Sequence, residues 1–496
     1  MIELVLTIAT TLYILGTGFL VIFVSGFGVL LLIYLLTRRK TPSSPRVHDH
    51  DLLSVTVQLP IYNEPQVIAR LLDACTRLDY PADKLHIQIL DDSTDQTTAL
   101  IQRKLEALHA EGIHHITHIH RKDRAGYKAG ALAYGTQHVT TDCVVIFDAD
   151  FVPPVDFLRR TMPYFNANPR LGLIQTRWGH LNLDYNWLTR AQALNIDAHF
   201  IVEQVARSRG HLPMSMNGTG GIWRVEAIHD AGGWSSTTLT EDLDLSYRAF
   251  MRGWDFLYLV DVAVPGELTP LVQSYKVQQA RWATGSTQCL LKHLPTLLLS
   301  PRLTWAEKLM GLLHLAQYAV QPVILMLFLL TPVLLWGDMF RHLPNLTIVA
   351  LVSIIPPLVI ALGQYELYAD WRGRLLYFPV QFMAGVAIVL SNTRAVIAAL
   401  KKPEAHEFKR TPKFRLTERK HTLRRVRGVE QRIDTTTIGE LCLAVYALVG
   451  LLFALRSFPA LAPYMLSYAA SFTVFAVWNI YQTWALNTMQ RRLRPL

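Results

Sequence analysis

Hydrophobic residues follow two different patterns along the chain. Residues 4–36 form a long apolar run that is followed at once by basic residues at 38–40. A run of this length with a basic C-terminal flank predicts a membrane span that ends in the cytoplasm. Because the run is too long for a secretory signal core, we expect the span to be retained. Further apolar runs lie at 309–335, 346–363, 375–399, 438–455 and 464–486.

Basic residues indicate how these runs cross the membrane. The segment 400–437 carries about a dozen Lys and Arg, which places it on the cytoplasmic side together with the polar region 41–308. An even number of crossings must then separate the two regions, although three apolar runs lie between them. We expect 375–399 to be an interfacial helix, because its second half contains the polar stretch 391–394.

Between residues 54 and 260 the hydrophobic pattern alternates between strand-like and helix-like stretches. Apolar or alternating stretches predict strands, and longer amphipathic stretches between them predict helices. This βαβ order predicts a doubly wound α/β sheet, which binds ligands at the carboxyl ends of its strands. The predicted strands are 54–60, 85–92, 113–120 and 143–150, and the predicted helices are 65–77, 94–111 and 127–138.

The composition agrees with a membrane protein. Hydrophobic residues make up 51% of the 496 residues, the mean hydropathy is +0.22 and the formal net charge is +10. Cytoplasmic loops account for an excess of Lys and Arg, so we expect no nucleic-acid partner. Four widely spaced cysteines without a CxxC pair argue against a zinc site or a disulfide framework and favour buried thiols. They are Cys75, Cys143, Cys289 and Cys442.

Acidic residues stand where two predicted strands end. Asp148 and Asp150 end the stretch CVVIFDAD, and Asp91 and Asp92 end LHIQILDD. Two carboxylates one residue apart repel each other, and a divalent cation would relieve that repulsion. Oxygen ligands suit Mg²⁺ or Mn²⁺, which carboxylates usually hold together with substrate phosphates. The alternative is a solvated loop with turn-forming Asp residues, and the pattern alone does not decide between them.

Basic and aromatic residues suit a phosphorylated sugar ligand. Lys128, in GYKAGAL, begins a predicted helix whose backbone N–H groups favour phosphate. In VQQARW, Gln278 and Arg281 share one helical face, and an Arg can hold a diphosphate through paired hydrogen bonds. Trp282 offers a flat face for a sugar ring. The alternatives are an exposed lysine and a Trp/Arg anchor at the membrane interface.

The stretch TEDLDLSYRAFMRGW, at 240–254, places three acids at a predicted helix start. Thr240 can act as the N-cap, and acids in the first turn favour the helix dipole, so a structural role is one interpretation. The other is a carboxylate that acts on a substrate. Both interpretations hold if the helix start presents Asp242 to a ligand while Glu241 and Asp244 lie beside it.

Histidines also cluster within the predicted strand 113–120. His114, His118 and His120 would face one side of that strand. No Cys or acid accompanies them in the sequence, so we expect an ordinary polar strand rather than a metal site.

Four motifs resemble a known signature. DDSTD, FDADF, LTED and QQARW stand in the order D, DxD, TED, QxxRW of processive family 2 glycosyltransferases, and the interval from Asp242 to Gln278 also fits. Within 55–290, VQLPIYNE, GYKAGAL, NGTGGIWR and EDLDLSYRA resemble cellulose-synthase-like A enzymes, the plant mannan and glucomannan synthases, and their bacterial relatives. The membrane part is similar only in layout.

The resemblance implies a GT-A fold, which is a Rossmann-like α/β domain, on the cytosolic side of an α-helical transmembrane domain with interfacial helices. It also implies a role for each matching residue. Asp242 would be the general base with Glu241 beside it, and Asp148 and Asp150 would hold Mg²⁺ or Mn²⁺. The nucleotide sugar would contact Tyr62, Glu64, Asp91, Asp92, Lys128, Asp148, Gln278 and Arg281. The acceptor side would be formed by Trp282, Asn217, Gly218 and Thr219. The last three of these residues would also border the donor sugar.

The basic segment holds a second resemblance. EFKRTPKF, at 407–414, resembles the gating-loop motif FxVTxKG of cellulose and hyaluronan synthases. Phe408, Thr411 and Lys413 match the motif, whereas Arg410 and Phe414 depart from it. The alternative is a basic loop at the membrane surface.

These features predict an inverting hexosyltransferase of the cell membrane that polymerises a β-linked glucan or mannan and exports it. Its expected partners are UDP-glucose or GDP-mannose, the growing glycan and membrane lipids, and no protein partner is indicated. The alternatives are a lipid glycosyltransferase that makes a single transfer and a transporter, although the apolar spans hold few of the ionisable residues that transport requires. The expected domains are a membrane helix at 1–40, the cytosolic GT-A domain at 41–300, membrane helices at 301–370, an interfacial helix with the gating-like loop at 371–437, and membrane helices at 438–496.

Overall fold

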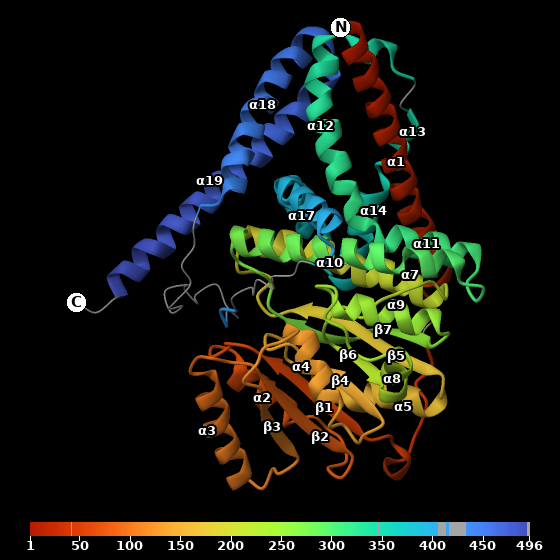
Figure 1. Cartoon of the computed structure of the whole chain (residues 1–496), viewed down its shortest axis with the longest axis vertical. Helices are drawn as coiled ribbons and strands as arrows, with labels where there is room; N and C mark the ends of the chain where they lie inside the picture. The colour runs from red at the N-terminus through yellow and green to blue at the C-terminus, as the bar shows by residue number, and fades with distance from the viewer. Residues whose placement is uncertain (41, 345–346, 405–412, 416–432, 494–496) are drawn as a thin grey trace.

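The computed structural model describes residues 1–40, 42–344, 347–404, 413–415 and 433–493. A sheet domain and a bundle of long helices lie at opposite ends of the molecule (Figure 1). Helix α10 (Val272–Leu299) lies across the junction between them. This helix carries the VQQARW motif, so the motif lies where the two parts meet.

A seven-stranded mixed sheet forms the centre of the first part, in the order β3-β2-β1-β4-β6-β5-β7. Strands β1 to β4 pair in parallel and confirm the predicted βαβ order. Strand β6 runs antiparallel to both of its neighbours. The strands are β1 (Val55–Ile61), β2 (Leu85–Asp91), β3 (Ile116–His120), β4 (Cys143–Ile146), β5 (Leu171–His180), β6 (Gly221–Arg224) and β7 (Asp255–Gly266).

Helices cover both faces of this sheet, as the near-continuous apolar strands require. The core on one face contains Val57, Ile89 and Leu71, and the core on the other contains Leu90, Ile146 and Leu245. The three predicted helices are present; the first two start three residues later than predicted, and the third starts at the predicted residue 127. The first face is covered by α2 (Ile68–Cys75), α3 (Thr97–Ala110) and α5 (Phe157–Ala167), and the second by α4 (Tyr127–Thr136), α8 (Val225–Asp230) and α9 (Glu241–Met251).

The cysteines follow the predicted pattern only in part. All four are free thiols. Cys75, Cys143 and Cys289 are buried, whereas Cys442 is exposed on α18 (Thr435–Ser457). The exposed thiol lies on a helix of the apolar bundle, where a small hydrophobic side chain suits a lipid-facing position.

Six helical stretches of the described chain are long and apolar enough to cross a membrane, by length and composition. Large apolar side chains are exposed along α1 (Ile2–Thr37) and α18, including Leu15 and Leu452, as lipid-facing positions would be. The protein is therefore an integral membrane protein. The six stretches are Ile2–Thr37, Gln317–Trp336, Thr347–Leu367, Trp371–Lys401, Thr435–Ser457 and Pro459–Thr488.

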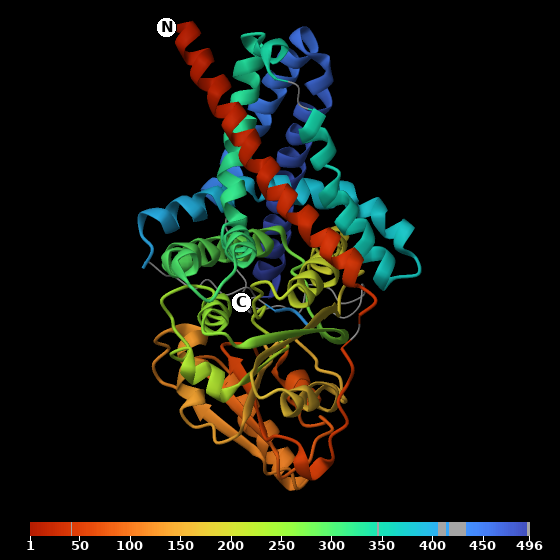
Figure 2. The ribbon, with the colours of Figure 1, turned by 90° about the vertical axis from the view of Figure 1, so that its right-hand side faces the viewer.

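The stretch Trp371–Lys401, which contains the predicted interfacial helix, is one of these six. It is broken into short pieces, the last of which is α17 (Val389–Lys401). Helix α17 lies across the direction of α1 and α12 (Val320–Trp336) rather than alongside them (Figure 2). Its orientation agrees with an interfacial helix, which stays a prediction.

Membrane helices pack directly on the sheet domain. Leu30 and Tyr34 of α1 share a buried cluster with Phe200 and Val205, which belong to the sheet domain, and with Ile360 of α14 (Ile355–Leu367). The second part of the molecule is thus continuous with the first, and the pocket described next lies close to this contact.

Candidate active site

A pocket lies at the carboxyl edge of β1 and β4, where the sheet meets α9 and α10. It brings together residues from motifs spread over more than half of the chain. The expected site residues that line it are Tyr62, Glu64, Asp92, Lys128, Asp148, Asp150, Asn217, Gly218, Glu241, Asp242, Gln278, Arg281, Trp282 and Lys413.

The two DxD carboxylates lie just beyond β4, which ends at Ile146 rather than at the predicted residue 150. Lys128 Nζ donates to Asp148 Oδ1 at 2.6 Å and to the carbonyl oxygen of Gly218 at 2.8 Å. Lys413 Nζ donates to Asp150 Oδ2 at 2.6 Å. Each carboxylate therefore holds an ammonium group, which offsets the repulsion expected between two acids at one edge.

The donor set of this edge fits a divalent cation. Asp148 and Asp150 offer only oxygen ligands, and Glu241 and Asp242 add negative charge nearby. Oxygen-only sites of this kind suit Mg²⁺ or Mn²⁺. Lys413 occupies an oxygen of Asp150 in this conformation, so a cation that binds Asp150 through that oxygen must displace it.

Asp242 stands in the first turn of α9. Thr240 occupies the N-cap position without a side-chain capping bond, so the expected capping role of this threonine is absent. Burial, together with the negative charges of Glu241 and Asp148, raises the pKa of Asp242 to about 7, although Lys128 and the Leu243 N–H oppose the shift. A carboxylate with such a pKa is suited to accept a proton near neutral pH.

Asp244 points to a different environment. Its carboxylate accepts from His293 Nε2 at 2.8 Å and from Arg248 Nε at 2.9 Å, and it forms a 2.6 Å ion pair with Lys292. Burial raises the pKa of Asp244, but these partners outweigh burial and hold the pKa below its ordinary value. Asp244 therefore fixes α9 against α10, whereas Asp242 and Glu241 of the same helix line the pocket.

Helix α10 presents Gln278, Arg281 and Trp282 to the pocket. Burial lowers the pKa of Arg281, while the surrounding carboxylates, Glu241 first among them, favour its charged form. The helix approaches α9 closely because Gly285 has no side chain. A Cβ atom there would lie 2.5 Å from Thr240 Cγ2 and 2.9 Å from the Thr240 backbone nitrogen.

Gly218 forms another close approach. It has a φ of +79°, a conformation that L side chains rarely adopt. A Cβ at this position would lie 3.3 Å from Asp242 Oδ2. Neighbouring Asn217 is held by Gln204 and His199, whose Nε2 lies 3.2 Å from Asn217 Nδ2.

Residues expected to hold the nucleotide form one side of the pocket. The guanidinium of Arg124 stacks 3.4 Å from the centre of the Tyr62 ring. Asp92 accepts two hydrogen bonds from Arg121, at 2.7 and 2.6 Å. Glu64 is also buried there.

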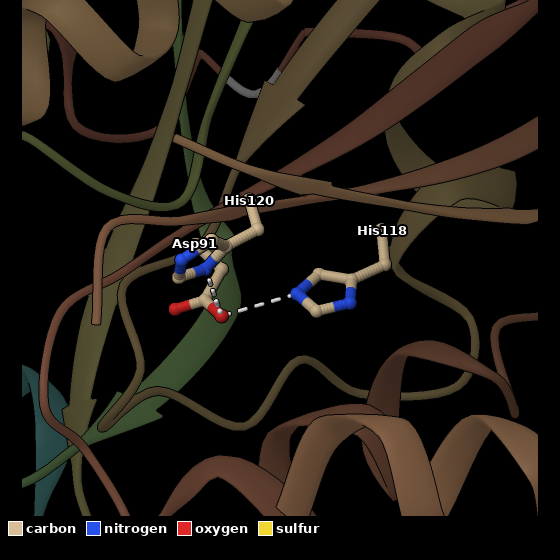
Figure 3. Close-up of side chains that lie close together, drawn as sticks. All are labelled: Asp91, His118 and His120. Atoms are coloured by element: carbon tan, nitrogen blue, oxygen red, sulfur yellow. Dashed lines mark hydrogen bonds and ion pairs between the residues drawn. The ribbon is translucent and has the colours of Figure 1, made fainter. Parts of the chain in front are cut away.

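Asp91 and Thr219 lie elsewhere than expected, and neither lines the pocket. The fully buried Asp91 faces His118 and His120 on the α3 side of the sheet (Figure 3). It turns away from Asp92 because successive residues of a strand point to opposite faces. Thr219 is also fully buried, and its hydroxyl accepts from the backbone N–H of Asp148 at 3.0 Å.

Several pocket residues were not singled out from the sequence. They include Arg124, His180, Gln192 and Glu267. His180 ends β5 and Glu267 directly follows β7, so the rule that ligands bind at the carboxyl ends of strands would have found both. Glu267 also accepts from Arg70 at 2.6 Å.

The gating-like motif is described only at its end. Phe408 and Thr411 lie outside the described residues, whereas Lys413 lines the pocket. The next residue, Phe414, is buried against Leu271 and Leu486. The segment 413–415 therefore reaches the pocket and contacts the base of the membrane helices.

Comparison with known proteins agrees with this geometry. Residues 53–285 match the model of the glycosyltransferase-like family 2. The domain belongs to this family. The match confirms the resemblance seen in the D, DxD, TED, QxxRW motifs, all of which fall within these residues.

Curated relatives of this domain are plant enzymes. A probable glucomannan 4-beta-mannosyltransferase 4 of Oryza sativa subsp. japonica is 44% identical over 242 residues, which are 48% of this chain and 44% of the relative. The glucomannan 4-beta-mannosyltransferase 2 of Arabidopsis thaliana is 38% identical over 317 residues, 59% of each chain. The chain thus spans about half the length of these relatives.

A solved structure shares the fold. A mannosyltransferase from Pyrobaculum calidifontis, in complex with GDP-Man and Mn²⁺, superposes with a TM-score of 0.54 at 21% identity. The superposition covers 80% of this chain and 100% of the other. It confirms the GT-A fold of the family 2 domain, here combined with the helices of the membrane bundle.

Proposed function

We propose that this protein is an inverting hexosyltransferase that polymerises β-linked mannose from GDP-mannose and exports the glycan across the membrane. The observation that carries the proposal is the single pocket that unites Asp148, Asp150, Asp242, Arg281 and Trp282 beside the membrane helices. The names of the plant relatives and the GDP-Man in the similar structure favour mannose over glucose as the transferred sugar.

Asp242 serves as the general base in this proposal. It takes the proton of the acceptor hydroxyl as that oxygen attacks the anomeric carbon from the face opposite the nucleotide. One displacement inverts the α-linked donor and yields a β-linkage. A positioned base with a pKa near the working pH contributes roughly 10²–10⁴-fold to the rate, and the pKa of about 7 for Asp242 meets that condition.

Charge on the departing diphosphate is balanced by this chain's cations. Arg281 and Lys128 line the same pocket as Asp242 and can hold phosphate oxygens. A divalent cation bound by Asp148 and Asp150 would add Lewis-acid stabilisation of the leaving group. Trp282 offers its ring to the terminal sugar of the acceptor, and holding both sugars in line lowers the entropic part of the barrier.

The proposed arrangement in the cell follows from charge. The basic segment 400–437 and the family 2 domain lie on the cytosolic side of the plasma or inner membrane. The donor then enters the pocket from the cytosol, and the glycan leaves through the membrane bundle. The contact of Lys413 with Asp150 supports a gating role for its segment at the donor site.

Product analysis tests this function. The purified protein is supplied with Mn²⁺ or Mg²⁺ and with radiolabelled GDP-mannose or UDP-glucose, with and without lipid. We expect label from GDP-mannose in insoluble polymer that β-mannanase releases. Label from UDP-glucose in β-glucanase-sensitive polymer would show that the transferred sugar is glucose rather than mannose. Label confined to the lipid extract would replace the synthase with a lipid glycosyltransferase.

A further inference from the structure

A second group of potential metal ligands lies outside the pocket. Asp91 ends β2, and His118 and His120 stand two residues apart on the neighbouring strand β3 (Figure 3). Residues two apart on a strand point to the same face. The parallel register places His120 directly beside Asp91, so both imidazoles and the carboxylate converge on the α3 side of the sheet.

The geometry of the three ligand atoms is compact. His118 Nε2 and His120 Nδ1 each lie 3.1 Å from Asp91 Oδ2, and the three ligand atoms of the cluster all lie within 4.8 Å of one another. Ligand atoms bound tetrahedrally at about 2.05 Å from a zinc ion are about 3.3 Å apart. Small side-chain movements would therefore make room for an ion between the three groups.

The carboxylate is held in place by its own neighbours. Asp91 is fully buried, and its Oδ1 accepts from the Ser93 backbone N–H at 2.9 Å. Its Oδ2 accepts from the Thr98 hydroxyl of α3 at 2.8 Å. Partners that orient a ligating carboxylate in this way are a regular part of protein metal sites.

The cluster is open to solvent on one side. The side chains of His118 and His120 are 13% and 39% exposed, whereas that of Asp91 is fully buried. An ion can thus reach the imidazoles, and water can complete its coordination. Three protein ligands with one open position form a common zinc arrangement.

We propose that Asp91, His118 and His120 form a binding site for a transition-metal ion of the zinc type, separate from the DxD carboxylates. Imidazole nitrogens select zinc-like ions, whereas oxygen-only sets suit Mg²⁺ and Mn²⁺. The neutral imidazoles bind through His118 Nε2 and His120 Nδ1, so their protons reside on the other ring nitrogens. The ion ties the edge strand β3 to β2.

The site lies next to the nucleotide side of the pocket. Asp92 follows Asp91 directly, and Arg121 follows His120. Arg121 donates its backbone N–H to the Asp91 carbonyl at 2.9 Å and its side chain to Asp92. A metal on Asp91 and His120 would therefore also fix the Arg121–Asp92 pair. The metal site itself does not depend on the function proposed above.

Zinc titration tests the site. The full-length protein, purified without a histidine tag and stripped of metals, is titrated with Zn²⁺ against a chromophoric chelator, with excess Mg²⁺ to occupy the DxD carboxylates. We expect one zinc per chain and a rise in melting temperature. Because even the loss of an outer partner costs 10–100-fold in metal affinity, His118→Ala/His120→Ala should weaken binding by at least about 100-fold.

A matched double variant controls for surface histidines. His114→Ala/His138→Ala removes two exposed imidazoles that lie outside the cluster and should leave zinc binding unchanged. Electron paramagnetic resonance of Cu²⁺ bound to the unmutated protein should show two imidazole nitrogens as ligands. This measurement does not depend on whether a variant folds. Zinc affinity that is equal in both double variants, or Cu²⁺ without nitrogen ligands, would overturn the proposal.

Discussion

Two acids two residues apart in α9 have opposite electrostatic environments. Burial and nearby carboxylates raise the pKa of Asp242 to about 7. Asp244 also lies in the first turn of the helix, yet its hydrogen-bond and ion-pair partners His293, Arg248 and Lys292 hold its pKa below the ordinary value against the effect of burial. This difference is what the proposed roles require, with Asp242 as the base and Asp244 as a structural residue.

Replacing Asp242 tests this difference. Asp242→Asn should abolish transfer while nucleotide binding stays nearly intact, because the base is lost and the shape is kept. Because its pKa is raised in the folded state, the carboxyl contributes stability at low pH that is lost as the pH rises from 3.8 to about 7. The variant should therefore melt higher at pH 8, by roughly 2–4 °C. The gain should shrink as the pH falls from about 7 towards the ordinary carboxyl pKa of 3.8, where both folded and unfolded chains become protonated.

Asp244→Asn is the control for that variant. It leaves Arg248, Lys292 and His293 without their shared carboxylate, and breaking such a buried pair costs about 3–5 kcal/mol. Its melting temperature should fall. If both variants changed stability in the same direction at pH 8, the assigned environments would be incorrect.

The pH dependence of transfer gives a separate reading. Asp242 must be deprotonated to accept a proton, so kcat/KM should rise with pH and level off above a midpoint of about 7. The profile is measured with saturating Mn²⁺ and varied GDP-mannose. A flat profile across neutrality would remove Asp242 as the titrating base.

Sequence reasoning located most residues of the site but not the direction of each side chain. The motifs named fourteen residues that the structure gathers in one pocket. Asp91 was assigned to the nucleotide with Asp92, although adjacent strand residues face opposite sides of a sheet. The acid that accompanies His118 and His120 was missed for a related reason. Asp91 lies far from them in the sequence and becomes their neighbour only through the pairing of β2 with β3.

At the scale of elements, α10 supplies three residues of the site. It carries Gln278, Arg281 and Trp282 and packs against Thr240 through Gly285. The sequence predicted the helical spacing of the motif. It could not show this contact, because the approach of two helices depends on the space left by a glycine.

A substitution at Gly285 tests the contact. Gly285→Ala would place a Cβ 2.9 Å from the Thr240 backbone nitrogen, which cannot move aside as a side chain can. Because a displacement of about 1 Å can cost roughly 10²-fold in rate, kcat should fall by one to two orders of magnitude. The melting temperature should also fall.

Gly385→Ala is the matched control, since it lies in helix α16 (Phe378–Ala387) with no atom within 4 Å of its Cβ position. Alanine favours helices over glycine by up to about 1 kcal/mol, so this variant should be as active and as stable as the unmutated protein or slightly more stable. Equal kinetics for the two variants would contradict the role of close packing at Gly285.

At the scale of the whole molecule, a buried polar cluster joins the two parts. Lys276 of α10 forms a 2.5 Å ion pair with Glu440 of α18, and both side chains are almost fully buried. Gln273 of α10 bonds Asp434 and Asn479 nearby. The sequence predicted the order of domains and spans, but this contact joins residues 164 positions apart.

Breaking this ion pair tests how the parts are coupled. Glu440→Gln leaves the Lys276 ammonium buried without its carboxylate, at a cost of about 3–5 kcal/mol. The melting temperature in detergent should fall clearly. Lys276→Met combined with Glu440→Gln removes both charges and should recover most of the loss, whereas equal losses in the single and double variants would contradict the pairing.

The central claim is that one molecule both builds a β-mannan and moves it across a membrane. Sealed proteoliposomes with the catalytic domain outside are supplied with Mn²⁺ and radiolabelled GDP-mannose, and β-mannanase is added outside. We predict labelled polymer that resists the enzyme until detergent opens the vesicles. Polymer that is digested at once would contradict export, and label found only in lipid would contradict polymer synthesis itself.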